Sequence, residues 1–330
     1  MQPLQRLHVM LDKSAHSERP GADLHRLRRI FDRRAKAFGD VAFLPREIAQ
    51  RMQERLEYIK VQPQRIIDVG CGPGADLPAL RSRYPQASVL GLDLSLAMAR
   101  QASESSGPAG WKRLLPQFTQ GLRDFARAAS GPVAGVVQGD YANLPFAGAV
   151  FDVLWSNLAL QWHATPDRVF PEWQRVLKVG GLLMFSTLGP DTLRELRVDG
   201  RQAATLSFVD MHDFGDMLVA SGFETPVMDA ETLTVTYKTP EALLRDVRKW
   251  GGESRSGLGP AGLGGRAVYG DLLASLERQR RPDGTIPLTF EVIYGHAWKA
   301  PVKTTPEGYG VVRLDEIGRG SARKPSKGLG

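Results

Sequence analysis

A glycine-rich turn follows an apolar run near residue 70, and an acidic residue ends the next apolar run. The turn is Asp68-Val69-Gly70-Cys71-Gly72-Pro73-Gly74, and Asp93 lies 23 positions after Gly70. In an α/β sheet this spacing places the turn and the carboxylate at the carboxyl ends of neighbouring strands, where open sheets bind nucleotide-like ligands. Glycines let the backbone pass close to a ligand. The pattern therefore predicts a nucleotide-binding crevice in which Asp93 accepts hydrogen bonds from the ribose hydroxyls.

Two kinds of nucleotide fit this turn. Gly70, Gly72 and Ala75 match the dinucleotide pattern G-x-G-x-x-G/A, with an acid about 20 residues later. Asp68 favours S-adenosylmethionine instead, because a carboxylate this close repels a pyrophosphate and attracts a methionine ammonium. Gly74 extends the pattern to D-x-G-x-G-x-G. We therefore predict S-adenosylmethionine as the cofactor, with Asp68, Gly70, Gly72 and Gly74 around its methionine end.

Two later strand ends complete the predicted cofactor site. Asp140 and Tyr141 follow the apolar run 133–138, and Asn157 ends the run 151–157. We predict that Asp140 and Tyr141 bracket the adenine, that Leu94 lies against it, and that Asn157 faces the methyl-transfer region.

Bulk composition excludes several classes of protein. No apolar run reaches the roughly 18 to 20 residues that span a bilayer, and the polar, charged N-terminus shows no signal peptide. Cys71 is the single cysteine, so an intrachain disulfide is excluded and a cysteine-based metal site is disfavoured. We therefore expect a cytoplasmic protein with no membrane association.

The net charge of +7 is concentrated at the two ends of the chain. Residues 1–36 carry a net charge of +5 and residues 299–330 carry +4. Basic ends suit an acidic protein or nucleic acid, although solvated termini produce the same pattern. Because no motif for binding RNA or DNA is present, we expect no nucleic-acid partner.

Strand-like and helix-like segments alternate through most of the chain. Apolar strand runs occur at 65–70, 87–94, 133–138, 151–157, 181–187, 232–237 and 287–298. Helical patterns occur at 24–38, 45–58, 76–84, 95–104, 167–178, 211–221 and 240–250. This alternation predicts an α/β fold with a doubly wound, Rossmann-like sheet of seven strands.

We divide the chain into three parts. Residues 1–22 are predicted to be a flexible N-terminus, and 301–330 a basic, flexible tail. Residues 23–300 form the predicted domain, with N-terminal helices over 23–60. The 47 residues from Asp93 to Asp140 exceed what one helix and one strand need, so 103–132 is predicted to be an insertion, with a helix near 116–129. A glycine-rich loop is predicted at 251–265.

Together with the later segments Phe151–Asn157 and Val176–Gly181, the glycine turn resembles class I methyltransferases. That resemblance implies a seven-stranded sheet whose last strand is antiparallel. The segments Trp155–Trp162 and Phe31–Ala35 further resemble malonyl-[acyl-carrier-protein] O-methyltransferases of the BioC type. They imply methylation of the free malonyl carboxylate, an early step of biotin synthesis, with malonyl-acyl carrier protein as an acidic partner.

Other segments keep two alternatives open. Gly189–Leu196, Asp213–Phe223, Asp283–Pro287 and Gly295–Lys299 also resemble a mitochondrial complex I assembly factor that hydroxylates an arginine of a partner subunit. A cofactor-binding assembly protein, or a methyltransferase for another substrate, therefore stays in view. The chain departs from the BioC pattern at Phe38, where a tyrosine is expected, and in the insertion.

The candidate substrate residues are those expected near the methyl group that is transferred. The malonyl carboxylate is ionised at pH 7, so its methylation needs no general base. Accordingly, no Ser-His-Asp set and no H-E-x-x-H metal motif stands out, and we expect no metal. The candidate substrate-pocket residues are Gln161, Trp162 and His163, which follow the 151–157 strand, and Arg194, which is suited to bind a carboxylate. Core packing for Trp162 and a surface position for Arg194 are the alternatives.

A cationic helix face offers a candidate contact for the partner. Arg26, Arg29, Arg33 and Arg34 recur at helical spacing. They are predicted to attract an acidic carrier protein, unless they form only a solvated helix face.

Overall fold

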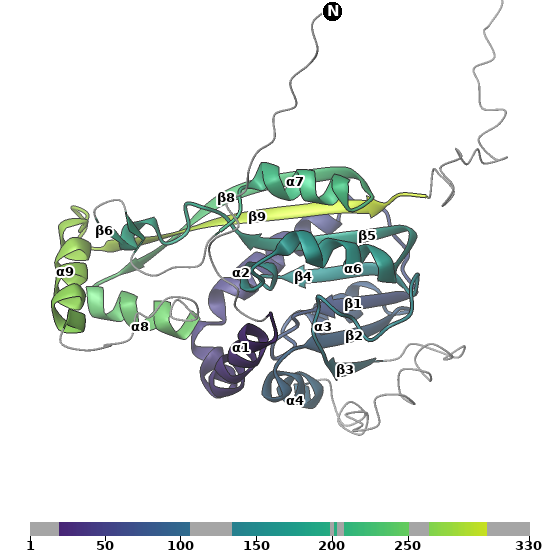
Figure 1. Cartoon of the computed structure of the whole chain (residues 1–330), viewed down its shortest axis with the longest axis horizontal. Helices are drawn as coiled ribbons and strands as arrows, with labels where there is room; N and C mark the ends of the chain where they lie inside the picture. Colours follow the sequence, from purple (N-terminus) through teal and green to yellow (C-terminus); the bar gives the residue numbers. More distant parts are fainter. Residues whose placement is uncertain (1–19, 106–133, 199–200, 203–207, 251–263, 302–330) are drawn as a thin grey trace, which may run out of the picture.

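The computed structural model describes residues 20–105, 134–198, 201–202, 208–250 and 264–301. Within these ranges a seven-stranded sheet runs through the molecule in the order β3-β2-β1-β4-β5-β9-β8 (Figure 1). The strands are β1 Arg65–Val69, β2 Ser88–Asp93, β3 Ala134–Gln138, β4 Phe151–Asn157, β5 Leu177–Leu188, β8 Phe223–Tyr237 and β9 Ile286–Lys299. The first five pair in parallel, and β9 is antiparallel to β5 and β8. The predicted fold class and the antiparallel last strand are confirmed.

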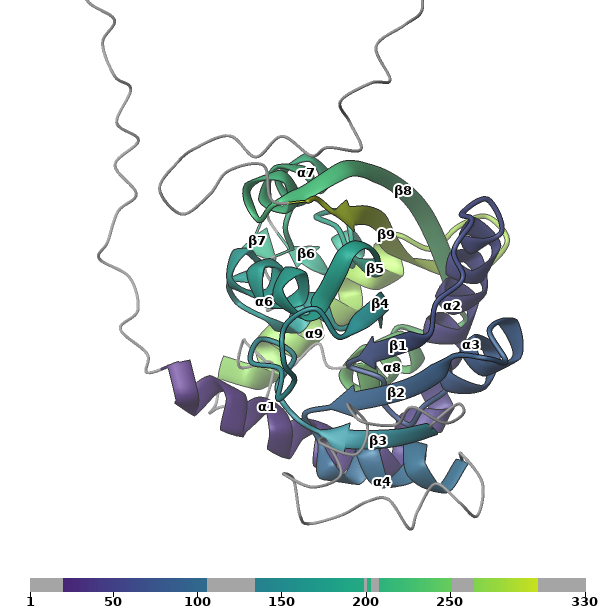
Figure 2. The ribbon, with the colours of Figure 1, turned by 90° about the vertical axis from the view of Figure 1, so that its right-hand side faces the viewer.

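Helices cover both faces of the sheet. Figure 2 shows α6 and α7 on one side and α2 and α3 on the other. The α-helices are α1 Pro20–Arg34, α2 Phe43–Leu56, α3 Leu77–Arg83, α4 Leu96–Ser105, α6 Val169–Val176, α7 Met211–Ala220, α8 Pro240–Trp250 and α9 Gly264–Arg278. Short 3₁₀ helices are η1 Ala35–Val41, η3 Leu160–Trp162, η4 Pro166–Arg168 and η5 Arg194–Leu196, and a two-stranded hairpin is formed by β6 Arg197–Val198 and β7 Arg201–Gln202.

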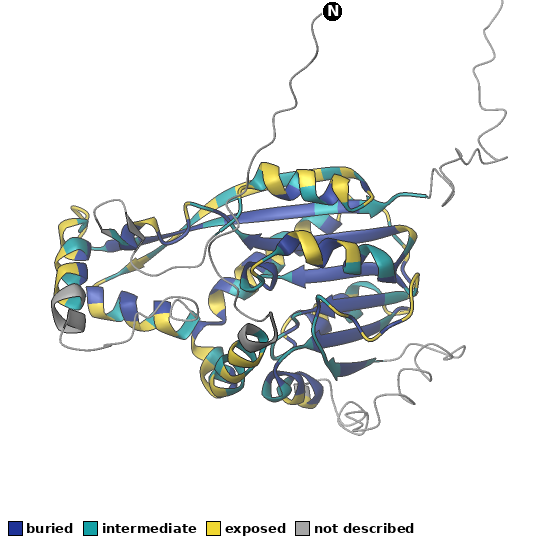
Figure 3. Ribbon diagram, viewed as in Figure 1, coloured by how far each residue is buried: buried dark blue, intermediate teal, exposed yellow. Residues whose placement is uncertain are grey.

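Successive residues of a strand pack into two separate hydrophobic cores, one on each face of the sheet. Ile66 packs on the face that carries α2, α3, α8 and α9, whereas its neighbour Ile67 packs on the face that carries α6 and α7. Because side chains alternate along a strand and both faces are covered, the central strands are apolar at nearly every position. Figure 3 shows this burial along the middle of the sheet. The two cores leave the strand ends free to carry polar groups.

The observed elements depart most from the sequence prediction at α9, the β6–β7 hairpin and β8. Helix α9 and the β6–β7 hairpin were not predicted, and β8 is longer than the predicted strand 232–237. The first part of β8 was missed because it contains Pro226, positive φ at Thr225 and a register shift between Glu224 and Val227. Helix α9 begins at Gly264 and Gly265, which were assigned to the glycine-rich loop.

Four predicted segments fall wholly or largely outside the described residues. They are the N-terminus 1–22, the insertion 103–132 with its helix, the glycine-rich loop 251–265 and the tail 301–330.

Gly295 marks the closest approach between β9 and its surroundings. A Cβ atom at this position would lie 2.4 Å from Cε1 of Phe185, which is fully buried. We expect Gly295→Ala to destabilise the fold by about 1–3 kcal/mol, the usual cost of overpacking a core. Urea unfolding, followed by circular dichroism, measures this change. Gly270→Ala is the control, because nothing lies within 4 Å of its Cβ position, and equal stability of both variants would contradict the expectation.

Candidate functional site

A cavity lies at the carboxyl ends of β1, β2 and β4. It holds about 1120 Å³ of empty space, the open mouth included. Its acidic part is formed by the side chains of Asp68, Asp76 and Asp93. Its apolar part is formed by Phe38, Leu44, Leu188, Trp250 and Phe290. One cavity therefore offers both a wall of carboxyl groups and an aromatic wall.

The glycine turn forms the floor of the acidic part. A Cβ atom at Gly70 would lie 2.3 Å from Cβ of Ala159, so the turn packs too closely for any side chain there. At Gly72, which lines the cavity, nothing lies within 4 Å of the Cβ position. The backbone is thus open to a ligand at Gly72. Gly74 packs against Ala102 of α4 and is not part of the lining, so its role is to close the turn.

Asp93 ends β2 and lies in the cavity wall. Its carboxylate accepts hydrogen bonds from the backbone N–H of Gly72 (2.9 Å) and of Ser95 (2.8 Å). Burial raises the pKa of Asp93 to about 6, while these two hydrogen bonds lower it. The contact to Gly72 joins the glycine turn to β2, so the two features that were predicted to act together do lie together.

Asp68 and Asp76 add two more buried carboxyl groups to the same wall. Asp68 is 1% exposed, and its Oδ2 atom has no hydrogen-bond partner among the described residues. Burial raises the pKa of Asp68 well above its usual value, and the charges of Asp76 and Asp93 add to this. Burial also raises the pKa of Asp76, against hydrogen bonds that lower it. The cavity wall therefore favours a cationic ligand, which would relieve this repulsion.

The sequence analysis missed Asp76. An aspartate at the start of a helix is ordinarily a cap, and Asp76 stands at the N-cap position of α3, yet its side chain makes no capping hydrogen bond. Instead it accepts hydrogen bonds from Nε1 of Trp155 (2.9 Å) and Nδ2 of Asn157 (3.1 Å). Both donors come from β4, about 80 residues further along the chain, so no local pattern announces the contact.

Asn157 lies in the cavity lining, and its side chain braces the wall. Its amide nitrogen also donates to the carbonyl of Pro45 (2.9 Å), and its oxygen accepts from the hydroxyl of Ser186 (2.9 Å). Asn157 therefore ties α2, β4 and β5 together beside Asp76.

The two residues predicted to bracket the adenine are placed differently from each other. Tyr141 lines the cavity and donates its hydroxyl to the carbonyl of Ala159 (3.1 Å), and burial raises its pKa far above the usual range. Asp140 is outside the lining and accepts from the backbone N–H of Ala142 (2.9 Å). Leu94 lines the cavity. The adenine contact of Asp140 therefore gains no support from the geometry.

The three candidates after β4 also divide. Gln161 and Trp162 line the cavity, and the indole of Trp162 meets the ring of Phe31 edge-to-face at 5.0 Å. His163 is outside the lining; its Nδ1 accepts from the backbone N–H of Thr165 (3.2 Å), and burial lowers its pKa. Of these three residues, Gln161 and Trp162 line the cavity and His163 does not.

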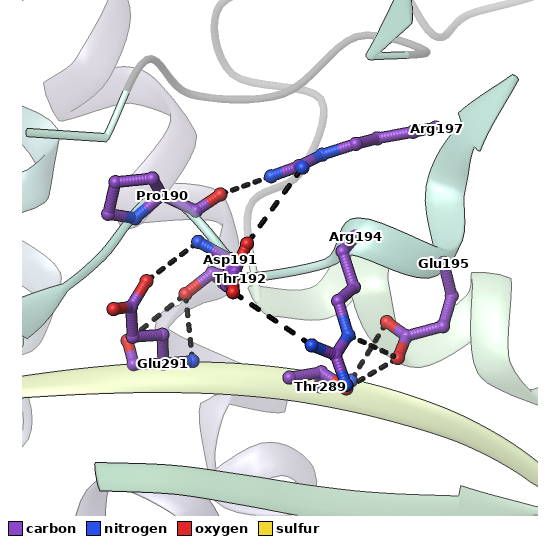
Figure 4. Close-up of polar contacts among 8 residues, drawn as sticks. All are labelled: Pro190, Asp191, Thr192, Arg194, Glu195, Arg197, Thr289 and Glu291. Carbon is purple, nitrogen blue, oxygen red and sulfur yellow. Dashed lines mark hydrogen bonds and ion pairs between the residues drawn. The ribbon is translucent and has the colours of Figure 1, made fainter. Parts of the chain in front are cut away.

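Arg194 lies outside the cavity lining. Its guanidinium is near the carboxylates of Asp191 (3.9 Å) and Glu195 (3.7 Å), and 53% of its side chain is exposed (Figure 4). Glu195 itself is buried and accepts hydrogen bonds from the backbone and hydroxyl of Thr289 in β9. The contacts of Glu195 hold the loop after β5 against β9. Arg194 lies at the surface of this loop, which is the alternative that the sequence analysis left open for it.

Comparison with known proteins identifies the family. The model of a methyltransferase domain matches residues 67–185. A malonyl-[acyl-carrier protein] O-methyltransferase of Laribacter hongkongensis is 43% identical over 282 residues, which cover 84% of this chain and 90% of that protein. Another, from Gallionella capsiferriformans, is 41% identical over 88% of this chain and 96% of that protein. The chain belongs to this methyltransferase family.

A solved structure supports the same fold for the methyltransferase. The YcgJ protein of Bacillus subtilis covers 76% of this chain and 98% of its own, with a TM-score of 0.50 at 16% identity. At this identity the likeness concerns the fold alone.

The cofactor of this methyltransferase is S-adenosylmethionine, and the residues present fit it. The molecule carries a cationic sulfonium and an ammonium group, which suit a wall of three carboxyl groups. The buried Oδ2 of Asp68 lacks a partner that a cation would provide. Gly72 leaves the space that close approach of a ligand to the backbone requires.

The described residues show neither a metal-binding cluster nor a membrane-spanning helix. No group of three histidine, cysteine, aspartate or glutamate side chains is arranged to hold a metal ion there. No helix in these ranges is long and apolar enough to cross a membrane.

We expect Asp93→Ala to weaken S-adenosylmethionine binding by about 1–3 kcal/mol, the scale of lost hydrogen bonds to a charged acceptor. Isothermal titration calorimetry measures the affinity, and circular dichroism checks the fold. Asp152→Ala is the control, because its carboxylate binds Lys178 and the backbone of Arg65, outside the cavity. Unchanged affinity in a folded Asp93→Ala variant would show that Asp93 does not hold the ribose.

Cofactor binding should release protons from the methyltransferase. In the free enzyme the pKa values of Asp68 and Asp76 are raised, and a bound cation favours their ionised forms. The affinity should therefore fall as the pH is lowered. Calorimetry in two buffers of different ionisation enthalpy counts the protons released.

The Asp76→Asn variant should release fewer protons than the wild type when the cofactor binds, because Asp68 then ionises more readily in the free enzyme. The asparagine oxygen can still accept the hydrogen bond from Trp155. Two results would contradict this account of the carboxyl pair. One is that the wild type has identical binding enthalpies in the two buffers, and the other is that the variant releases as many protons as the wild type.

Proposed function

We propose that this methyltransferase transfers a methyl group from S-adenosylmethionine to the free carboxylate of malonyl-acyl carrier protein, an early step of biotin synthesis. The observation that carries the proposal is the 43% identity to a malonyl-[acyl-carrier protein] O-methyltransferase over 90% of that protein's length. The geometry of the cavity is consistent with it, since an acidic part for the cofactor adjoins an apolar part for an acyl thioester.

In this proposal each wall of the cavity has its own ligand. Asp93 binds the ribose, Leu94 and Tyr141 lie beside the adenine, and Asp68 and Asp76 face the methionine end. Gln161 and Trp162 line the same cavity and would contact the acyl group. The aromatic rings of Trp250 and Phe290, whose centroids are 4.9 Å apart, supply an apolar wall for the uncharged part of the substrate.

The proposed reaction needs little acid–base catalysis. When bound, the cofactor supplies an electrophilic methyl group on a cationic sulfur. A malonyl carboxylate is already ionised at pH 7, so an oxygen–carbon bond can form as the carbon–sulfur bond breaks, and no proton needs to move. The protein's contribution is orientation and exclusion of water, and orientation alone is worth roughly 7–11 kcal/mol in favourable cases.

Phe38 stands in the lining where the family resemblance led us to expect a tyrosine. A phenyl ring fills the same apolar space but offers no hydroxyl to a ligand. In the proposed reaction Phe38 therefore acts by shape and by keeping water out.

The segments that suggested an assembly factor have local structural contacts in this chain. Thr192 donates its hydroxyl to the carbonyl of Glu291, and the backbone N–H of Asp191 donates to the Glu291 carboxylate (2.7 Å; Figure 4). These contacts, like those of Glu195, hold the loop against β9. No contact among the described residues favours the hydroxylase alternative.

Intact mass spectrometry of the acceptor tests the proposal. We expect malonyl-acyl carrier protein to gain the mass of one methyl group when it is incubated with the enzyme and S-adenosylmethionine. Acetyl-acyl carrier protein, which lacks the free carboxylate, should gain nothing. No gain on the malonyl form by an enzyme with measured cofactor binding would refute the proposed substrate and favour another acceptor or a non-catalytic role.

A further inference from the structure

Helix α1 presents two different faces. Leu27 and Phe31, four residues apart, line the cavity. Arg26, Arg29 and Arg33 are exposed and fall on the opposite face at helical spacing. None of these three arginines is in an ion pair within the described part of the chain. The helix that walls the cavity therefore carries uncompensated positive charge on its outer side.

This helix is held firmly against the cofactor end of the cavity. Asp32 accepts hydrogen bonds from the hydroxyl of Ser95 (2.6 Å) and the backbone N–H of Ala97 (3.2 Å), at the start of α4. Ser95 in turn donates its backbone N–H to Asp93. One of the acidic side chains of α1 is therefore engaged internally.

The surface continues onto η1 and α8. Arg34 of α1 donates to the carbonyl of Arg248 (3.1 Å), and Trp250 donates its indole N–H to the carbonyl of Val41 (3.0 Å). Lys249 pairs with Asp40 (3.0 Å), which engages a second acidic group. Lys36 of η1 and Arg245 of α8 are exposed. Helix α8 packs against η1, which directly follows α1 in the chain.

The apolar part of the cavity reaches this surface. Trp250 lines the cavity and contacts Phe43, which has 46% of its surface exposed. Phe38, also in the lining, belongs to η1. The elements that carry the exposed cationic side chains thus also carry the aromatic rings at the outer part of the cavity.

We propose that α1, η1 and α8 form the docking surface for the acidic carrier protein, whose acyl arm enters the cavity beside Phe38 and Trp250. This inference rests on the proposed function and adds where the partner binds. Its basis is charge complementarity: an acidic protein meets exposed arginine and lysine side chains, while nearby Asp32 and Asp40 are already paired. Such a surface acts mainly on the encounter and on its dependence on salt.

The test compares a protein-bound substrate with a small one. Arg26→Glu/Arg33→Glu is assayed with malonyl-acyl carrier protein and with malonyl-N-acetylcysteamine, a small thioester without the protein. The matched control is Lys60→Glu/Arg278→Glu, which makes the same change in charge at two exposed positions. Lys60 follows the end of α2, and Arg278 is the last residue of α9.

We expect the α1 variant to lose about tenfold or more in kcat/KM for the carrier protein at low salt, and the loss to shrink as salt is added. Its kcat/KM for the small thioester should stay within about twofold of the wild type, since the cavity is untouched. Equal losses on both substrates, no loss on the carrier protein, or an equal loss in the control variant would overturn the docking surface.

Direct binding keeps this result separate from the proposed reaction. Surface plasmon resonance measures capture of malonyl-acyl carrier protein by the wild type and by both variants. If the wild type methylates neither substrate, the proposed function fails, while weaker capture by the α1 variant alone still supports the surface. Equal capture by all three proteins overturns the surface whether or not the wild type is active.

Discussion

Crowding of three carboxyl groups in one wall is the constraint on which the site depends. Asp68, Asp76 and Asp93 come from the end of β1, the start of α3 and the end of β2, and the fold buries the first two and leaves Asp93 partly exposed. Burying like charges together is costly unless a cation or a proton intervenes. The surrounding donors meet only part of this cost, through Gly72, Ser95, Trp155 and Asn157. A binding site that is electrostatically strained when empty gains affinity for a cationic cofactor, at the expense of stability in the free protein.

The remaining contacts of the site can be understood as supports for that wall. Asn157 holds Asp76 and is itself held by α2 and β5, so three elements must be in place before the carboxylate is oriented. Ser95 links Asp93 to Asp32, and thereby links the cofactor end of the cavity to α1. Two short hydrogen-bonded steps thus connect Asp93 in the cavity wall to Asp32 of α1.

The parts of the fold that could be predicted from sequence are those governed by local pattern. The apolar strands, the glycine turn and the spacing to Asp93 follow from side-chain alternation and from backbone freedom at glycine, and both are local. Asp76, α9 and the first half of β8 were missed for a common reason. Trp155 and Asn157 reach Asp76 only through the parallel sheet. Pro226 in β8 and Gly264 in α9 obscure the sequence pattern of two elements that are stabilised by packing on β9 and the neighbouring core. Arg194 shows the reverse case, in which a residue type suited to binding carboxylates is placed outside the cavity by the contacts of its own loop.

The position of β9 in the sheet has a consequence for the timing of synthesis. This strand is formed by residues 286–299, yet it lies between β5 and β8, and β8 joins the sheet only through it. It also supplies Phe290 to the cavity. While the chain is being made, β8 must therefore wait without its partner until residues 286–299 have left the ribosome, since pairing between distant segments comes late in folding. A newly made chain therefore cannot complete this cavity before β9 has been made, because Phe290 belongs to that strand.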